Sequence, residues 1–265
     1  PYENIPETTR RAVKYIEEQK EIEAPFFLYF AFPSPHAPII PNDEFDGKSE
    51  AGPYGDYVYE TDAACGQILA ALEETGQSEN TIVIFSADNG PEKYAYARDE
   101  TYGHWSAEPL RGLKRDIYEG GHRVPYLIKW PGVVEGGQVS DALVSQIDLM
   151  ATFARMLDYE LPDDAAEDSH DLGPLLKGEV DSIRDFHVHQ TRSEKWAMRK
   201  GEWLLIEGND GYHSGRVKAW EEKRSYPADD KGKVELYNLA SDLGQKNNLA
   251  ADNPEKVAEL STLLE

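Results

Sequence analysis

Cysteine is almost absent from this 265-residue chain, which contains only Cys65. A single thiol excludes an intramolecular disulfide framework and a cysteine-rich zinc site. Positive charge is also scarce, because 27 Lys and Arg residues stand against 50 Asp and Glu residues and give a formal net charge of -23. A field of that sign repels polyanions, so nucleic acid is not expected as a partner.

Long apolar runs are missing as well. The longest, residues 26–32, is far shorter than the roughly 18 residues of a membrane span, so no span is expected. The chain starts at Pro1 without an initiator Met, a basic leader or an apolar export segment, which predicts a fragment of a longer protein. Its hydrophobic content of 40% is sufficient for the core of one large domain or the cores of two smaller ones.

The first 162 residues alternate helical and strand patterns. Apolar spacing predicts a surface helix at residues 7–19 and a second helix that Gly76 ends. One apolar face of the second helix is expected to hold Val58, Cys65, Ile68, Leu69 and Leu72. A further helix is expected from Asp148, as its N-cap residue, to Leu157.

Short continuous apolar runs predict buried strands at residues 26–32, 81–86 and 124–130, the first of them buried on both faces. Strands separated by helical patterns indicate an α/β fold class, with layers of helix and sheet and with the chemistry at the strand ends. Residues 1–162 are therefore expected to form most of an α/β domain.

Residues 163–265 have a different pattern. An acidic loop at residues 163–171 marks the expected boundary. Short strands are expected at residues 186–190, 196–199, 203–206 and 234–239, and a closing helix at residues 254–264. Together they predict a small α+β subdomain with a short antiparallel sheet. The polar stretch 208–232 is expected to be mobile or to lie across a functional surface.

Two segments offer groups that suit an anion or metal site. Asp88 and Asn89 follow an expected strand and supply a carboxylate and an amide carbonyl, the hard oxygen ligands that Ca²⁺ and Mg²⁺ prefer. Asp-Asn-Gly is also an ordinary turn sequence. His36 lies in a stiff proline-rich loop, where it suits either an acid or oxyanion contact or a structural hydrogen bond.

Two further segments contain cations and glycines. Residues 111–115 bring three cations together in a strongly anionic chain, which predicts either a local anion site or a solvated basic patch. Residues 119–121, Glu-Gly-Gly, supply the backbone freedom of a tight turn and are expected to be architectural.

The order and spacing of these motifs, at residues 26–38, 86–90, 111–114 and 119–125, resemble the sulfatase family, in the arylsulfatase branch of the alkaline-phosphatase-like superfamily. Segments 52–69 and 236–250 also look like that family, so the resemblance extends over nearly the whole chain. It implies that residues 1–162 are the C-terminal part of the sulfatase α/β catalytic domain and that residues 163–265 are a linker and a small subdomain.

The resemblance also implies roles for individual residues. Asp88 and Asn89 correspond to two ligands of a divalent cation, usually Ca²⁺ with Mg²⁺ possible. His36 and Lys114 correspond to catalytic residues that contact the sulfate or the leaving oxygen, where negative charge develops. His104 and Arg111 are candidates for substrate contact, and Arg111 has bracing of its loop as the alternative; Glu119, Gly121 and Arg123 look structural.

One departure from the family pattern stands out. Sulfatases make a formylglycine nucleophile in a Cys-x-Pro-x-Arg or related motif and carry two further acidic metal ligands, and this chain has neither. Cys65, in Ala-Ala-Cys-Gly-Gln, is expected to be a small buried packing residue. The chain is therefore predicted to be the C-terminal portion of a sulfuric ester hydrolase that is inactive alone and binds calcium weakly.

Two alternatives stay open from the sequence. One is a phosphodiesterase or phosphonate hydrolase of the same superfamily, and the other is a non-catalytic paralogue that binds sulfated glycans. The expected partners are a sulfate ester of a sugar or aryl alcohol and either the missing N-terminal half or a second copy of the chain. The resemblance implies a periplasmic, secreted or lysosomal location without selecting among them.

Overall fold

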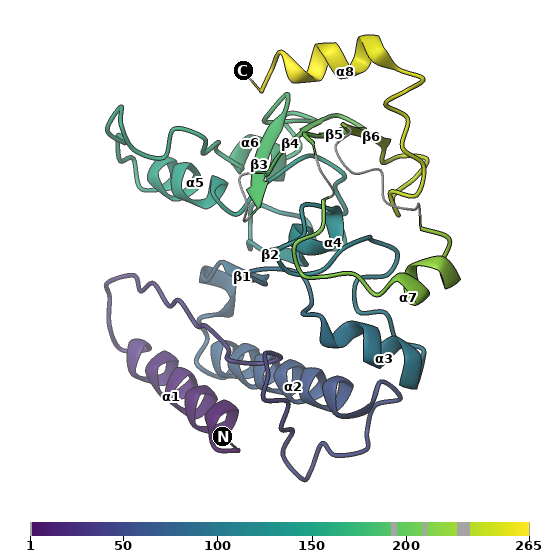
Figure 1. Ribbon diagram of the computed structural model, residues 1–265. Coiled ribbons are helices and arrows are strands. Elements are labelled where there is room, and N and C mark those ends of the chain that lie inside the picture. The colour runs from purple at the N-terminus through teal and green to yellow at the C-terminus, as the bar shows by residue number, and fades with distance from the viewer. Residues whose placement is uncertain (1, 192–194, 209–210, 227–233, 265) are drawn as a thin grey trace. The chain divides into compact units, whose positions relative to one another are not determined.

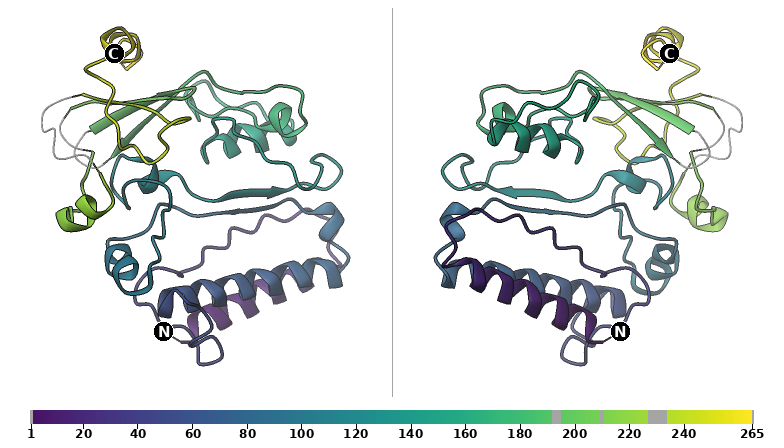
Figure 2. Two further views of the ribbon diagram at one scale, coloured as in Figure 1. Left: turned by 90° about the vertical axis from the view of Figure 1, so that its right-hand side faces the viewer. Right: turned by 90° about the vertical axis from the view of Figure 1, so that its left-hand side faces the viewer.

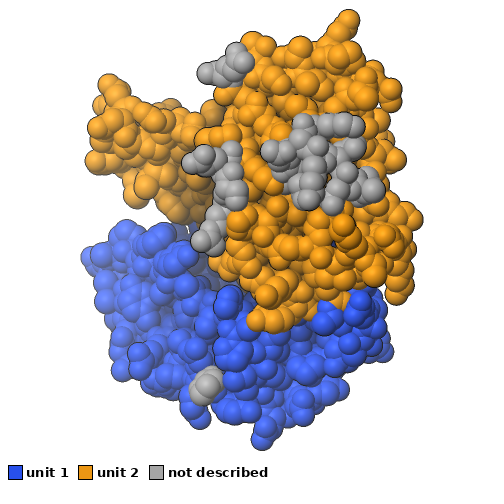
Figure 3. Space-filling model, viewed as in Figure 1, with its two compact units in different colours: residues 1–83, 97–105, 130–132 blue, residues 84–96, 106–129, 133–265 orange. Residues whose placement is uncertain are grey.

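A computed structural model describes residues 2–191, 195–208, 211–226 and 234–264 of the chain (Figure 1). The chain divides into two compact units (Figure 3). Unit 1 comprises residues 1–83, 97–105 and 130–132, and unit 2 comprises residues 84–96, 106–129 and 133–265. In the part of the chain that the structure describes, no helix has the length and apolar character needed to cross a bilayer.

Unit 1 is built on two helices that pack side by side, α1 (Asn4–Gln19) and α2 (Gly52–Glu74) (Figure 2). Ile16 of α1 packs with Ala71 and Leu72 of α2. The chain leaves α2 through Gly76, whose φ of +74° favours glycine. A short 3₁₀ helix, η1 (Ser78–Asn80), follows. Both expected helices are confirmed, and α1 begins before residue 7.

The expected apolar face of α2 is wrong in part. Val58 and Leu69 are 40% and 44% exposed, and Cys65 is half-buried rather than buried. The buried face instead includes Tyr57 and Ala64, which pack with Ile5 of α1. Helical spacing identified an apolar stripe, but the position of α1 determines which stripe is covered.

The strand expected at residues 26–32 is also wrong for this chain. The segment is extended, yet among the described residues no strand pairs with it. Phe26 and Leu28 pack against the α1–α2 core, whereas the alternate residues Phe27 and Tyr29 are 74% and 83% exposed. One face of the segment is therefore buried and the other is open to solvent.

Unit 2 contains the paired strands β1 (Val83–Ser86) and β2 (Tyr126–Lys129), which lie where strands were expected. Their expected burial is wrong in part, because Phe85 and Leu127 are 43% and 58% exposed. The first residue of β1, Val83, belongs to unit 1, and the rest of the strand belongs to unit 2. The helices of this region are α3 (Tyr94–Tyr102), which runs from unit 2 into unit 1, α4 (Glu119–His122), α5 (Asp148–Met156) and α6 (Gly173–Leu176).

Helix α5 lies where the sequence predicted it, but Asp148 is not its N-cap residue. Ile147 occupies that position, and Asp148 is the first helical residue. Its fully buried carboxylate accepts hydrogen bonds from the Ser145 N–H at 2.7 Å and the His170 N–H at 3.0 Å. It also forms an ion pair with Arg184. The carboxylate therefore holds a loop and a distant arginine in place.

The rest of unit 2 is built on a four-stranded antiparallel sheet in the order β3-β4-β5-β6. Its strands are β3 (His187–Thr191), β4 (Lys195–Lys200), β5 (Trp203–Ile206) and β6 (Glu235–Asn238). Leu204 and Ile206 pack with Tyr118 on one face, and Leu205 packs with Leu260 of helix α8 (Pro254–Ser261) on the other. The sheet and closing helix expected here are confirmed.

The polar stretch 208–232 contains a helix that the sequence did not predict, α7 (Lys218–Lys223). Residues 209–210 and 227–232 of that stretch lie outside the described residues, so its expected mobility stays a prediction. The boundary expected after residue 162 also stays a prediction.

Candidate functional site

The Asp88–Asn89 pair lies in the loop that follows β1. The Asn89 side-chain N–H donates to the Gly90 carbonyl at 2.9 Å, which leaves the amide oxygen available to a cation. Asp88 is exposed, and its carboxylate forms no hydrogen bond or ion pair with another described residue. Just before it, the Gln146 amide donates to the Ala87 carbonyl at 2.6 Å and so fixes the start of the loop.

Main-chain hydrogen bonds join this loop to the segments of Lys114 and of α4. The Lys114 N–H donates to the Pro91 carbonyl at 2.8 Å, and the Gly90 N–H donates to the Gly121 carbonyl at 3.0 Å. Three segments separated in sequence therefore form one framework, which carries the oxygen atoms of Asp88 and Asn89 together with the Lys114 turn.

Glycines allow these segments to approach so closely. A Cβ atom at Gly90 would lie 1.8 Å from the Gly120 carbonyl oxygen. One at Gly120 would lie 2.4 Å from the Gly112 carbonyl oxygen, and one at Gly121 would lie 2.1 Å from that of Asp116. Each distance is far inside van der Waals contact, so the packing excludes any side chain at these positions.

The Asp116 side chain holds the turn that contains Lys114 in place through hydrogen bonds. Its carboxylate, 3% exposed, accepts hydrogen bonds from the N–H groups of Leu113, His213 and Ser214 at 2.8, 2.7 and 2.9 Å. The Ser214 hydroxyl in turn donates to the Lys114 carbonyl. Sequence reasoning missed Asp116, because nothing near it in the chain indicates partners almost a hundred residues away.

A charged pair borders the same turn. The Arg115 guanidinium lies 2.6 Å from the Glu92 carboxylate. Burial opposes ionisation of Glu92, but the Lys93 N–H and Arg115 together hold its pKa below its ordinary value, and Lys114 adds to this effect. Anionic Glu92 therefore lies within the electrostatic reach of Lys114.

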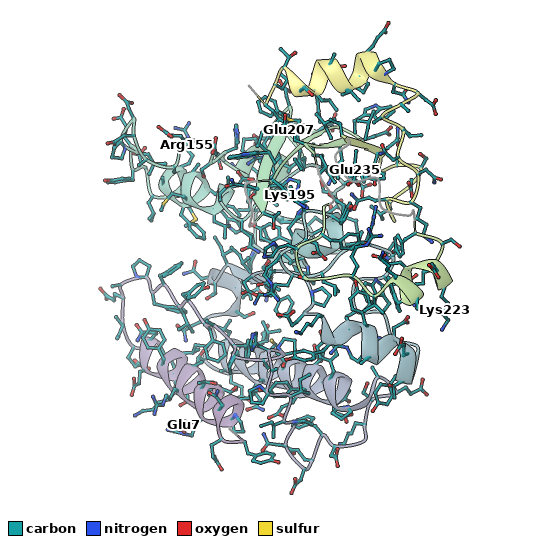
Figure 4. All side chains as sticks on the ribbon, in the orientation of Figure 1. Glu7, Arg155, Lys195, Glu207, Lys223 and Glu235 are labelled. Carbon is teal, nitrogen blue, oxygen red and sulfur yellow. The ribbon has the colours of Figure 1, made fainter. Side chains whose placement is uncertain are left out.

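Arg111 is enclosed within unit 2. Its guanidinium donates to the hydroxyls of Tyr212 and Tyr237 at 2.9 and 3.0 Å and to the Gln245 carbonyl at 3.0 Å. It lies 3.8 Å from the carboxylate of Glu235, labelled on β6 in Figure 4. With Arg111 only 3% exposed, these contacts favour bracing over substrate contact.

His36 belongs to unit 1. Its ring Nδ1 lies 2.7 Å from the Ala37 carbonyl oxygen, which can only accept, so Nδ1 carries a proton and Nε2 is the nitrogen left for other contacts. The ring is exposed. The loop is anchored through Ser34, whose hydroxyl accepts a hydrogen bond from the Thr61 hydroxyl of α2 at 2.6 Å.

His104 and Cys65 also belong to unit 1. His104 is exposed, with its ring centroid 6.3 Å from that of Tyr54. Burial raises the pKa of the Cys65 thiol, and the charge of Asp62 raises it further. A thiol with a raised pKa is a poor nucleophile at neutral pH.

Known proteins identify the family. A sequence model of the sulfatase family matches residues 5–159. This chain belongs to the sulfatase family. The resemblance seen in the sequence and the expected α/β fold class are thereby confirmed.

This sulfatase chain is 36% identical to the N-acetylgalactosamine-6-O-sulfatase of Bacteroides thetaiotaomicron, over 97% of the chain and 49% of that protein. It is 38% identical to the N-acetylgalactosamine-6-sulfatase of Mus musculus, over 65% of the chain and 32% of that protein. A solved 6S-sulfatase structure from the glycosaminoglycan metabolism of Bacteroides thetaiotaomicron superposes with a TM-score of 0.82 and 33% identity. That match covers 99% of this chain and 54% of the solved one. The sulfatase chain thus spans about half the length of the solved protein, and less of the mouse enzyme.

Proposed function

We propose that the protein carrying this chain is a sulfuric ester hydrolase, and that Asp88, Asn89 and Lys114 are among the residues that this chain contributes to its sulfate site. The hydrogen bond from the Lys114 N–H to the Pro91 carbonyl supports this most directly, because Pro91 is two residues beyond Asn89. This bond joins the Lys114 turn to the loop that contains Asp88 and Asn89, which supports a common site for a cationic side chain and two cation ligands. A cation and an ammonium group together complement the negative charge that develops at a sulfuryl group.

Asp88 and Asn89 would hold a divalent cation, Ca²⁺ by preference or Mg²⁺. Their carboxylate and amide oxygens are the hard donors that these ions take, and Asn89 presents its oxygen because its amide nitrogen is engaged. When bound, the ion would stabilise negative charge on the sulfate oxygens. Within the described residues no group of three or more His, Cys, Asp and Glu side chains could hold a metal. We propose that ligands from the rest of the protein would complete the site.

His36 would exchange a proton with the leaving-group oxygen through Nε2, since Nδ1 is bonded to the Ala37 carbonyl. His104 would contact the substrate, whereas Arg111 would stabilise the structure around it through its buried hydrogen bonds. The formylglycine nucleophile would also come from outside the chain, because Cys65 lacks its motif and has a raised pKa.

The substrate class we propose is a sulfated sugar. Two relatives named above act, by their names, on N-acetylgalactosamine 6-sulfate, and one of them aligns with 97% of this chain. A hexosamine 6-sulfate is therefore the sugar to test first. An aryl sulfate serves as a general probe of sulfate ester hydrolysis.

The partner we propose for the isolated chain is the remainder of the protein. Phe27 and Tyr29 project from an extended segment that lacks a strand neighbour among the described residues. Burial of exposed aromatic side chains favours association with a further part of the protein. Without the remainder, a second copy of the chain would cover the same exposed face.

Hydrolysis assays test the proposed activity. The full-length protein should release sulfate from an aryl sulfate and lose that activity with a chelator. Lys114→Ala should lower kcat/KM by about 10²- to 10³-fold, the usual effect of removing one group that stabilises the transition state. Exposed Lys177→Ala is the control. The 265-residue chain alone should give no turnover, and hydrolysis by the pure chain would contradict the proposal that its nucleophile lies elsewhere.

Calorimetric titration tests the cation site. Affinity rises with the number of charged ligands, and here only Asp88 is charged. The chain alone should bind Ca²⁺ with a dissociation constant of about 10⁻⁴ M or weaker, and Asp88→Asn should abolish the heat. Submicromolar affinity would show that the chain contains a complete site.

A further inference from the structure

We propose that Asp116 is a positioning residue that directs Lys114 by tying the 111–116 turn to the loop at residues 211–214. The proposal rests on the sulfate-contact role given to Lys114 above. Asp116 itself touches neither substrate nor cation in this assignment. It acts through the main chain on both sides of Lys114.

The Asp116 carboxylate divides its hydrogen bonds between two segments. One oxygen, Oδ2, accepts the Leu113 N–H at 2.8 Å, inside the turn. The other, Oδ1, accepts the N–H groups of His213 and Ser214 at 2.7 and 2.9 Å. Hydrogen bonds to a buried ionised acceptor are stronger than neutral ones. The carboxylate therefore links the two segments through these hydrogen bonds.

The main chain of Lys114 is fixed on both sides by this arrangement. Its N–H donates to the Pro91 carbonyl, and its carbonyl accepts the Ser214 hydroxyl, which Asp116 holds in place. The next residue, Arg115, has a φ of 77°, a conformation that non-glycine residues rarely adopt. That conformation persists only where surrounding bonds maintain it. Arg115 itself is held by the Thr191 hydroxyl at its carbonyl and by Glu92 at its guanidinium. Asp116 and Ser214 hold the main chain just before it, at Leu113 and Lys114, and so help to set the direction in which the Lys114 side chain leaves the turn.

Asparagine at position 116 cannot accept hydrogen bonds from both segments at once. An asparagine side chain has one acceptor oxygen, and its NH₂ group can only donate. In Asp116→Asn, either the Leu113 N–H or the N–H groups of His213 and Ser214 must therefore face another donor. The shape of the side chain is kept while the coupling is lost.

Asp242 provides a matched control in the same unit. Its carboxylate also accepts main-chain N–H groups of a following loop, from Lys246 at 2.8 Å and Asn247 at 2.7 Å. Both N–H groups reach Oδ2, so the single acceptor oxygen of asparagine can keep both bonds, and Asp242→Asn removes the charge of a loop-binding carboxylate without dividing its bonds. Any effect of losing a carboxylate charge alone should appear in both variants.

The decisive experiment is a double-mutant cycle in the full-length protein, with an aryl sulfate as substrate. Asp116→Asn should lower kcat/KM by about 10- to 100-fold, the usual effect of misplacing a catalytic group, and Asp242→Asn should not. In the Lys114→Ala background, Asp116→Asn should have no further effect, because the group that it positions is gone. An equal loss in both backgrounds, or no loss in either, overturns the proposal.

A second measurement separates this proposal from the proposed function. In the 265-residue chain, acetylation of the Lys114 amine by an amine-reactive ester is followed by mass spectrometry, with Lys177 as the internal reference. Asp116→Asn should change the ratio of the two rates severalfold, and Asp242→Asn should leave it at the wild-type value. An unchanged ratio overturns the positioning role, whether or not the full-length protein hydrolyses sulfate esters.

Discussion

At the residue scale, the candidate site depends on positions where no side chain fits. Gly90→Ala would place a Cβ atom 1.8 Å from the Gly120 carbonyl oxygen, so the loop bearing Asp88 must move. We expect the free energy of unfolding to fall by about 1–3 kcal/mol or more, as for other overpacked sites. Urea denaturation of the wild-type chain and of Gly90→Ala measures the difference in their free energies of unfolding.

Gly66→Ala is the matched control. Gly66 lies inside α2, and a Cβ atom there would meet nothing within 4 Å. Alanine is the better helix former, so this variant should be more stable by about 0.5–1 kcal/mol. Equal stability of the two variants would mean that the close approach at Gly90 is not needed.

Residues that act through neighbours in sequence were predictable, and those that act across the fold were not. Asp88, Asn89 and Lys114 could be proposed from the sequence because their motifs are short and ordered, and their roles stay predictions. Asp116 was not, because its partners His213 and Ser214 are remote in sequence. Arg111 stayed open between two roles until its contacts showed how fully it is enclosed.

At the element scale, two histidines join α4 to β3. The rings of His122 and His189 have centroids 4.0 Å apart, and both Nε2 atoms lie 3.2 Å from the Ile117 carbonyl oxygen. Burial lowers the pKa of His189 to about 3 and that of His122 to about 4, and each is opposed by its bond to Ile117. Positive charges nearby, from Arg199 among others, favour the neutral form of His122.

This pair predicts acid sensitivity. In the unfolded chain the histidine pKa is about 6.5, so below that pH the unfolded state binds more protons than the folded state. The free energy of unfolding should therefore fall as pH drops from 7 toward 4, by up to about 2 kcal/mol at pH 5 from His189. His189→Gln should make the urea midpoints at pH 7 and pH 5 more similar. His170 is exposed, so His170→Gln is the control and should keep the pH dependence of the wild type. If His189→Gln keeps it too, the His122–His189 pair is not responsible for the loss of stability in acid.

Elements with partners close in sequence were predicted best. β4 and β5 are joined by a tight turn, and their short apolar runs, which are covered on both faces of the sheet, are visible in the sequence. The segment 26–32 has a strand composition, but a strand needs a neighbour, and none of the described strands pairs with it. α7 was missed because Trp220 is its only large apolar residue, too little for a periodic pattern.

At the scale of the whole molecule, net charge and exposed aromatic surface act in opposite directions. A charge of -23 makes copies of the chain repel one another, and salt screens that repulsion. The aromatic rings at Phe27 and Tyr29, which are 74% and 83% exposed, favour association instead. Self-association of the isolated chain should therefore strengthen as salt is added.

Sedimentation of the double variant Phe27→Lys and Tyr29→Lys tests which surface is used. Burial of one aromatic side chain contributes about 1.5–3 kcal/mol, so losing two should weaken association by tenfold or more. The change also removes two units of net negative charge, which by itself reduces repulsion. Val139→Lys with Leu157→Lys makes the same charge change at residues that are 91% and 68% exposed, and this control should associate at least as strongly as the wild type. If both double variants associate alike, the exposed face of residues 26–32 is not the contact, and the proposal that the rest of the protein covers it loses its support.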